Sequence, residues 1–190
     1  MTRRWALASA VVVVACAAPP TDAPGSAVPP PAPSQITTPQ IATPQITTPS
    51  PASGTAMVVL TFYGGPDNDP PGPAIAHPNA RHGQAGGTGT YEDPITTASD
   101  PRAVPVGTLL YLPSLRKYLV MEDDCAACIE EWTATRTGHI DVWTGLSGSE
   151  LLACEEALTP PGPVLVEVGP PPDRPVEPQP LYSEETGCLA

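Results

Sequence analysis

The stretch MVVLTFYGGP, residues 57–66, carries the strongest fold signal in this sequence. β-Branched and aromatic residues fill positions 57–63, which predicts a strand, and Gly64-Gly65-Pro66 predicts a turn directly after it. The same pattern predicts four further strands, at residues 108–112, 118–121, 139–143 and 164–168. Short strands at irregular spacing, separated by loops rich in Gly and Pro, favour a small β-barrel.

One helix is predicted, over residues 149–158. Ser147 or Ser149 would cap its N-terminus. One of its faces would carry Leu151, Leu152 and Leu158. A protein of long helices is excluded, because Pro and Gly recur through nearly every other segment.

The first 56 residues differ in composition from the rest of the chain. Eleven of the 29 Pro residues lie between Pro19 and Pro51, and the unit QITTP at residues 35–39 is followed by QIATP and a second QITTP in the next ten residues. Repeated Pro favours an extended polyproline-like chain, so residues 17–56 are predicted to be a disordered linker. The folded domain is then expected at residues 57–168, followed by a Pro-rich tail at residues 169–190.

Residues 1–16 are predicted to be a signal peptide. Arg3 and Arg4 precede an apolar run that is too short to span a bilayer. The run ends in Val13-Val14-Ala15-Cys16, which resembles the lipobox of bacterial lipoproteins and implies that Cys16 is lipidated. We therefore expect an exported protein held on the extracellular face of a membrane by a lipid anchor alone. An ordinary signal peptide cleaved nearby is the alternative.

The chain is strongly acidic, with a net charge of −12 from 8 Lys and Arg against 20 Asp and Glu. This balance argues against a nucleic acid partner or an anionic lipid surface, because phosphate binding needs clustered basic residues. A neutral polysaccharide or a cation fits better, although an acidic surface also simply keeps an exported protein soluble.

Four cysteines remain after Cys16, and an even number in an exported protein predicts two disulfides. They are Cys125, Cys128, Cys154 and Cys188, and three pairings are open. A redox or zinc pair at Cys125 and Cys128 is the rival interpretation. It lacks a thioredoxin-like βαβ pattern, and the three histidines are scattered. We expect no metal and no cofactor.

Two clusters place carboxylates at predicted strands. The run Glu122-Asp123-Asp124 directly follows residues 118–121, and its mutual repulsion needs compensation. Calcium binding or the capping of a loop would also explain it. In residues 139–143 the alternation of a strand puts His139, Asp141 and Trp143 on one face. An indole beside a carboxylate suits a sugar ring, and a solvated strand face is the alternative.

Four segments resemble the double-psi β-barrel superfamily, which includes barwin, expansins, rare lipoprotein A and family-45 endoglucanases. TFYGG at residues 61–65 resembles the start of expansins and barwin-like proteins. Residues 120–128 resemble a D-x-C-x-x-C segment of secreted members, and residues 101–112 contain the P-x-G-T-x-x-Y strand start. Residues 139–141 resemble the H-F-D of expansins and the R-I-D of membrane-bound lytic transglycosylase A. All four occur in the family's order.

The resemblance implies a mainly β fold, a six-stranded double-psi barrel with one or two short helices. It also implies a groove lined by Tyr63, Asp123 and Asp141, in which Asp141 or Asp123 would be a general acid. Asp124 is one residue from the aligned position. Expansins keep this acid yet loosen polysaccharide without hydrolysis. The groove would bind substrate through Tyr63, His139, Trp143 and Asp124.

Three functions follow as hypotheses. The first is a barrel that binds or remodels wall or extracellular polysaccharide without turnover. The second is a glycan-cleaving enzyme that uses Asp141 or Asp123, and the third is a non-catalytic surface module stabilised by disulfides.

Overall fold

The computed structural model describes residues 53–189. The predicted signal peptide with Cys16 and most of the predicted linker lie outside these residues and stay predictions. No helix within the described part of the chain is long and apolar enough to cross a membrane.

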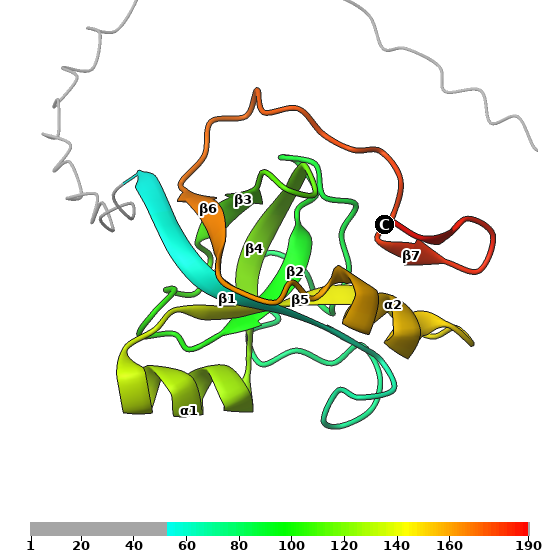
Figure 1. Cartoon of the computed structure of the whole chain (residues 1–190), viewed down its shortest axis with the longest axis horizontal. Helices are drawn as coiled ribbons and strands as arrows, with labels where there is room; N and C mark the ends of the chain where they lie inside the picture. The colour runs from blue at the N-terminus through cyan, green and yellow to red at the C-terminus, as the bar shows by residue number, and fades with distance from the viewer. Residues whose placement is uncertain (1–52, 190) are drawn as a thin grey trace, which may run out of the picture. The chain divides into compact units, whose positions relative to one another are not determined.

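Six strands close into a barrel (Figure 1). Around the barrel they follow the order β1 (Gly54–Gly64), β5 (His139–Gly145), β2 (Ile95–Ser99), β4 (Lys117–Asp124), β3 (Leu109–Leu112) and β6 (Val164–Val168). The pairs β1–β5 and β2–β4 are parallel, and the other neighbours are antiparallel. The predicted mainly β fold with a six-stranded barrel is confirmed.

The core fills the inside of the barrel. In β1 the alternating residues Val58, Leu60 and Phe62 are buried, as the period of two predicts. Ile140 and Val142 of β5 pair with Leu60 and Phe62 and are fully buried beside them. All five predicted strands are present, with ends shifted by a few residues.

One strand of the barrel, β2, and one helix, α1, were not predicted from the sequence. Strand β2 is buried along its whole length, although its sequence ITTAS contains a single large apolar side chain. Helix α1 (Ala126–Thr135) occupies a segment expected to be an irregular loop. Cys125 is its N-cap residue, and the sulfur accepts a hydrogen bond from Cys128 N at 3.1 Å.

Helix α2 (Leu151–Leu158) matches the predicted helix, but two details of that prediction are wrong. Glu150 occupies the N-cap position, and no side chain there makes a capping hydrogen bond. Leu152 is 55% exposed, whereas Leu151 is buried. The buried face runs through Leu151, Cys154 and Glu155, because these positions repeat with the helical period and Leu152 does not share it.

Two disulfides are present, as predicted. One joins Cys125 to Cys128 at the start of α1, and the other joins Cys154 of α2 to Cys188. The second disulfide ties the C-terminal tail, with its small hairpin β7 (Tyr182–Ser183) and β8 (Gly187–Cys188), to α2.

The tail is an ordered wrap, as expected if Cys188 is bridged. From β6 it arches past the ends of β3 and β4 before it reaches β7 beside α2 (Figure 1). Tyr111 Oη donates to Pro175 O at 2.7 Å, and Tyr118 Oη donates to Pro171 O at 2.5 Å. The buried Lys117 ammonium donates to two tail carbonyls, those of Glu177 and Gln179, at 2.6 Å each.

Candidate functional site

The two predicted carboxylates lie in one row across four neighbouring strands. Ala98 of β2 pairs with Asp141 of β5 on one side and with Asp123 of β4 on the other. Thr61 of β1 pairs with Asp141 and extends the row. Residues paired across a sheet point to the same face, and two strand spacings separate the Asp123 and Asp141 backbones by roughly 10 Å. The topology therefore brings together residues 18 to 80 positions apart in the sequence.

Asp141 lies between Thr61 and Ala98 in this row. It is half-buried, and its Oδ1 accepts a hydrogen bond from Thr61 Oγ1 at 2.8 Å. Burial raises the pKa of Asp141 to about 6, against the opposing effect of the Thr61 hydrogen bond. The negative charges of Asp67 and Asp123 contribute to this raised pKa. Asp141 is thus a carboxyl that keeps its proton at mildly acidic pH.

His139 reaches Asp141 through Thr61. Its Nε2 lies 2.9 Å from Thr61 Oγ1, and because that hydroxyl gives its one proton to Asp141, Nε2 must carry the proton of this contact. Nδ1 lies 3.0 Å from Glu131 Oε2 but without hydrogen-bond geometry. Burial lowers the pKa of His139, and Glu131 opposes this effect. The imidazole is buried, and its contact with Thr61 links it to Asp141.

Asp123 has a different environment, 6% exposed and with both oxygens occupied. Oδ2 accepts from Tyr63 Oη at 2.9 Å, and Oδ1 accepts from the backbone N–H groups of Ala76 and Asp124 at 2.8 and 2.9 Å. Three hydrogen bonds to one carboxyl hold it in place. Asp123 therefore lies behind Tyr63 rather than on the groove surface.

The aromatic residues of the predicted site pack against each other. Tyr63 and Trp143 are paired across β1 and β5, and their rings meet edge to face with centroids 5.3 Å apart. Trp143 is 6% exposed, so its ring has no open face, which differs from the expected stacking surface. Trp143 and His139 are covered, because α1, α2 and the loops pack over a face that the strand pattern alone would leave to solvent.

The acidic run fastens the long loop between β1 and β2. Glu122 is fully buried, and its carboxylate contacts His82 Nδ1 at 2.5 Å and accepts from Thr96 Oγ1 at 2.7 Å. The exposed Asp124 lies 2.8 Å from His77 Nε2. Each acid thus has a different partner, in agreement with the loop-capping alternative. Within residues 53–189, no group of three or more His, Cys, Asp and Glu side chains is arranged to hold a metal ion.

A groove of about 420 Å³ opens above the row of carboxylates. Its walls combine acidic, small and apolar side chains from β1, the loop after β1, β2, β5 and the start of α1. They are Tyr63, Asp67, Asn68, Asp69, Ala98, Asp124, Cys125, Ala126, Ala127, Ile129 and Asp141. No basic side chain is among them, so the groove favours a neutral or cationic ligand over an anionic one. We call it the Asp141 groove.

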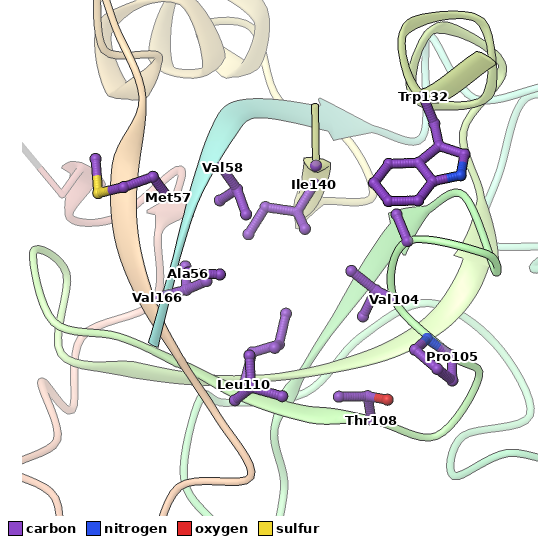
Figure 2. Close-up of a pocket in the computed structure, with 13 residues that line it drawn as sticks. Ala56, Met57, Val58, Val104, Pro105, Thr108, Leu110, Trp132, Ile140 and Val166 are labelled. Carbon is purple, nitrogen blue, oxygen red and sulfur yellow. The ribbon is translucent and has the colours of Figure 1, made fainter. Parts of the chain in front are cut away.

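A second cavity, of about 190 Å³, lies toward the start of β1 (Figure 2). Its lining is apolar and includes Val58, Leu110 and Val166, with Trp132 of α1 at its edge. Figure 2 shows these side chains converging on one space inside the barrel wall. Among the described residues that line it there are none of the predicted site residues and no ionisable group.

Two carboxyls near the site were not singled out from the sequence. Asp67 lines the Asp141 groove, and its Oδ1 accepts from Gly64 N at 2.7 Å. Glu155 is buried on α2. The spacing of Leu151, Cys154, Glu155 and Leu158 is that of one helix face, so this periodicity could have identified Glu155 as a buried acid.

The sequence matches the family described as the DDB_G0273701 N-terminal domain over residues 55–189. The chain belongs to this family. One curated relative is an uncharacterized protein of Dictyostelium discoideum, named DDB_G0273701/DDB_G0273221, which is 43% identical over 102 residues. The match covers 53% of this chain and 45% of the relative, so it spans about half of each protein. No solved structure matches.

The DDB_G0273701 N-terminal domain family takes the place of the expansin and rare lipoprotein A families that the motifs resemble. Residues 55–189 include the whole closed barrel, both helices and both disulfides. The family domain in this chain is therefore the barrel together with its C-terminal wrap, because the tail is bound to β3, β4 and α2.

Proposed function

We propose that this family domain binds a neutral polysaccharide of a cell wall or extracellular matrix in the Asp141 groove, as expansins do, and remodels it without clear hydrolysis. The observation that carries the proposal is the row of Thr61, Asp141, Ala98 and Asp123, which sets a half-buried carboxyl at the floor of an open groove. Carboxylates and amides on a groove wall are the groups that bind sugar hydroxyls.

The double-psi relationship belongs to the same proposal. Two parallel strand pairs, β1–β5 and β2–β4, support it, as does the placement of TFYGG beside residues 139–143 in one parallel pair. Delivery to the outside by a signal peptide and a lipid anchor at Cys16 would place the groove in a glycan layer. Nucleic acid is not a proposed partner, because the groove walls carry acids and no bases.

The test uses the purified protein with insoluble peptidoglycan, cellulose and chitin. We expect at least one glycan to retain the protein, and we expect Asp141→Asn to weaken retention about tenfold or more, the effect of losing one charge-assisted hydrogen bond. Asp173→Asn is the control, because Asp173 is an exposed acid of the tail. Equal retention of Asp141→Asn and wild type would contradict the proposal.

A glycan-cleaving activity is the second candidate, and the raised pKa of Asp141, about 6, favours it. A general acid must hold its proton near the working pH. Asp123 is a weaker candidate, because three hydrogen bonds already occupy its oxygens. Soluble fragments that appear with the wild type and vanish with Asp141→Asn would establish cleavage. No retention by any glycan would leave the disulfide-stabilised surface module.

A further inference from the structure

Glu155 is a buried carboxyl without an assigned role. It lies on the face of α2 that packs on the barrel, and it is 5% exposed. Its Oε1 has no hydrogen-bond partner within the described residues. Buried polar atoms are nearly always bonded in proteins, so an unpaired carboxyl oxygen calls for an explanation.

The sequence makes room for this carboxyl at Gly64. A Cβ atom added to Gly64 would lie 2.6 Å from Glu155 Oε1 and 2.8 Å from Gly145 O. Any other residue at position 64 would therefore displace the carboxyl or the backbone of β5. The backbone N–H of the same glycine donates to Asp67 Oδ1 at 2.7 Å. Glu155 and Asp67 thus both lie beside Gly64.

Among the described residues, no positively charged side chain acts on Glu155. Asp67 on the loop after β1 and Asp141 on β5 act on Glu155, and Glu156 is its exposed neighbour on α2. Burial, together with the negative charges of Asp67 and Asp141, raises the pKa of Glu155 to about 7. Near neutral pH a large share of molecules therefore carries a proton on Glu155. A protonated carboxyl is a hydrogen-bond donor, whereas an ionised one only accepts.

Glu155 lines a second groove, of about 450 Å³, with Thr61, Asp67, Leu152 and Glu156 among its walls. Asp67 lines both this groove and the Asp141 groove, so the two grooves share it as a wall residue. Thr61, which donates to Asp141, also belongs to its lining. A chain-like ligand in the Asp141 groove would continue across Asp67 toward Glu155. No Lys, Arg or His lines this second groove.

We propose that protonated Glu155 donates a hydrogen bond to a neutral saccharide that runs from the Asp141 groove across Asp67 into this second groove. The proposal deepens the proposed polysaccharide function and rests on it. Ionisation of Glu155 would remove the donor and add a third negative charge beside Asp67 and Asp141. Saccharide affinity is then expected to fall as the pH rises through 7.

The experiment compares wild type, Glu155→Gln and Glu184→Gln. Cellohexaose, chitohexaose and soluble peptidoglycan fragments are titrated into each protein by calorimetry at pH 6.5 and pH 8.5. Glutamine keeps an N–H donor and cannot ionise. We expect wild-type affinity to fall about fivefold or more between the two pH values and Glu155→Gln affinity to change less than twofold. Glu184→Gln, the same change at an exposed glutamate of the tail outside both grooves, should follow the wild type.

The outcomes separate this proposal from the proposed function. If a saccharide binds and Glu155→Gln keeps the wild-type pH dependence, the Glu155 proposal is overturned and glycan binding stands. If no saccharide binds the wild type at either pH, both are overturned. Titration of the Glu155 side-chain carbon by NMR in the wild type needs no variant to fold. Loss of the proton below pH 6 would also overturn the proposal.

Discussion

Tyr63 and Asp123, which lie 60 positions apart in the sequence, meet through a 2.9 Å hydrogen bond from the tyrosine hydroxyl to Asp123 Oδ2. Both residues are buried, and the bond ties β1 to β4 beneath the Asp141 groove. Burial raises the pKa of Tyr63, and the neighbouring Asp123 raises it further. Tyr63 therefore remains a neutral donor at every physiological pH, which keeps this contact intact under the groove.

Tyr63→Phe is expected to lower the free energy of unfolding by about 1.5–3 kcal/mol, because it leaves a buried carboxylate oxygen without its donor. Tyr91→Phe is the control, since the Tyr91 hydroxyl makes no hydrogen bond in the described part of the chain and its ring packs on Tyr118 in a similar edge-on manner. Urea denaturation measures both. Equal losses for the two variants would show that the hydrogen bond adds no net stability.

Gly64→Ala is expected to destabilise the fold by about 1–3 kcal/mol through overpacking. The new methyl group would lie 2.6 Å from Glu155 Oε1 and 2.7 Å from Leu151 Cδ2, and the backbone oxygen of Gly145 is also too near. Gly54→Ala, in the same strand, has no atom within 4 Å of its added Cβ and serves as the matched control. Thermal unfolding compares them, and a Gly64→Ala variant as stable as Gly54→Ala would contradict the close packing of Glu155.

Stability is expected to depend on pH through Asp141 and Glu155. Burial raises their pKa values from 3.8 to about 6 and from 4.5 to about 7. Between about pH 4 and pH 7 these two groups hold more protons in the native state than in the unfolded chain. Their contribution to the free energy of unfolding therefore falls as the pH rises through this window.

Asp141→Asn and Glu155→Gln should each remove part of that decline. Urea denaturation of both variants at a series of pH values, relative to the wild type, isolates each contribution from those of the other acids. The gain from Asp141→Asn should develop mainly between pH 4 and 6, and that from Glu155→Gln mainly between pH 4.5 and 7. Stability profiles parallel to that of the wild type would mean that burial raises the pKa of neither carboxyl.

The two disulfides should differ in their effect on stability. Cys154 and Cys188 are separated by 34 positions, and Cys125 and Cys128 by three. Loop-closure entropy predicts that the free energy of unfolding falls by about 3–4 kcal/mol when Cys154 and Cys188 are replaced by serine. Replacing Cys125 and Cys128 should lower it by about 1.5–2 kcal/mol. Chemical denaturation of the two double variants provides the comparison. A larger loss from the Cys125–Cys128 replacement would mean that packing at the start of α1 outweighs chain entropy.

The sequence was sufficient for five of the six barrel strands, because each has a short apolar or alternating run bounded by turn residues. It was insufficient for β2, where Thr96, Thr97 and Ser99 are fully buried but polar. Their hydroxyls bond to Glu122 and to the carbonyls of Asp141 and His139. A strand stabilised by hydrogen bonds from its own side chains leaves no hydrophobic pattern to detect.

The candidate site divides in the same way. Asp141, Asp123 and Tyr63 were identified from short motifs, whose residue types suggest their chemistry. The roles of these residues could not be separated, because the half-buried Asp141 and the fully bonded Asp123 differ only in their surroundings. Trp143 was expected to face a ligand, yet it is covered by segments distant in the chain.

By itself the sequence determined a β-rich fold, an acidic surface, an even set of cysteines and the strands that carry the site, since these properties depend on composition and local periodicity. Only the tertiary structure decided which cysteines pair, which acid faces the groove, and that Glu155 and Asp67 both lie beside Gly64. These features arise where strands and helices far apart in sequence pack together, and burial there sets the charge and hydrogen bonding of each carboxyl.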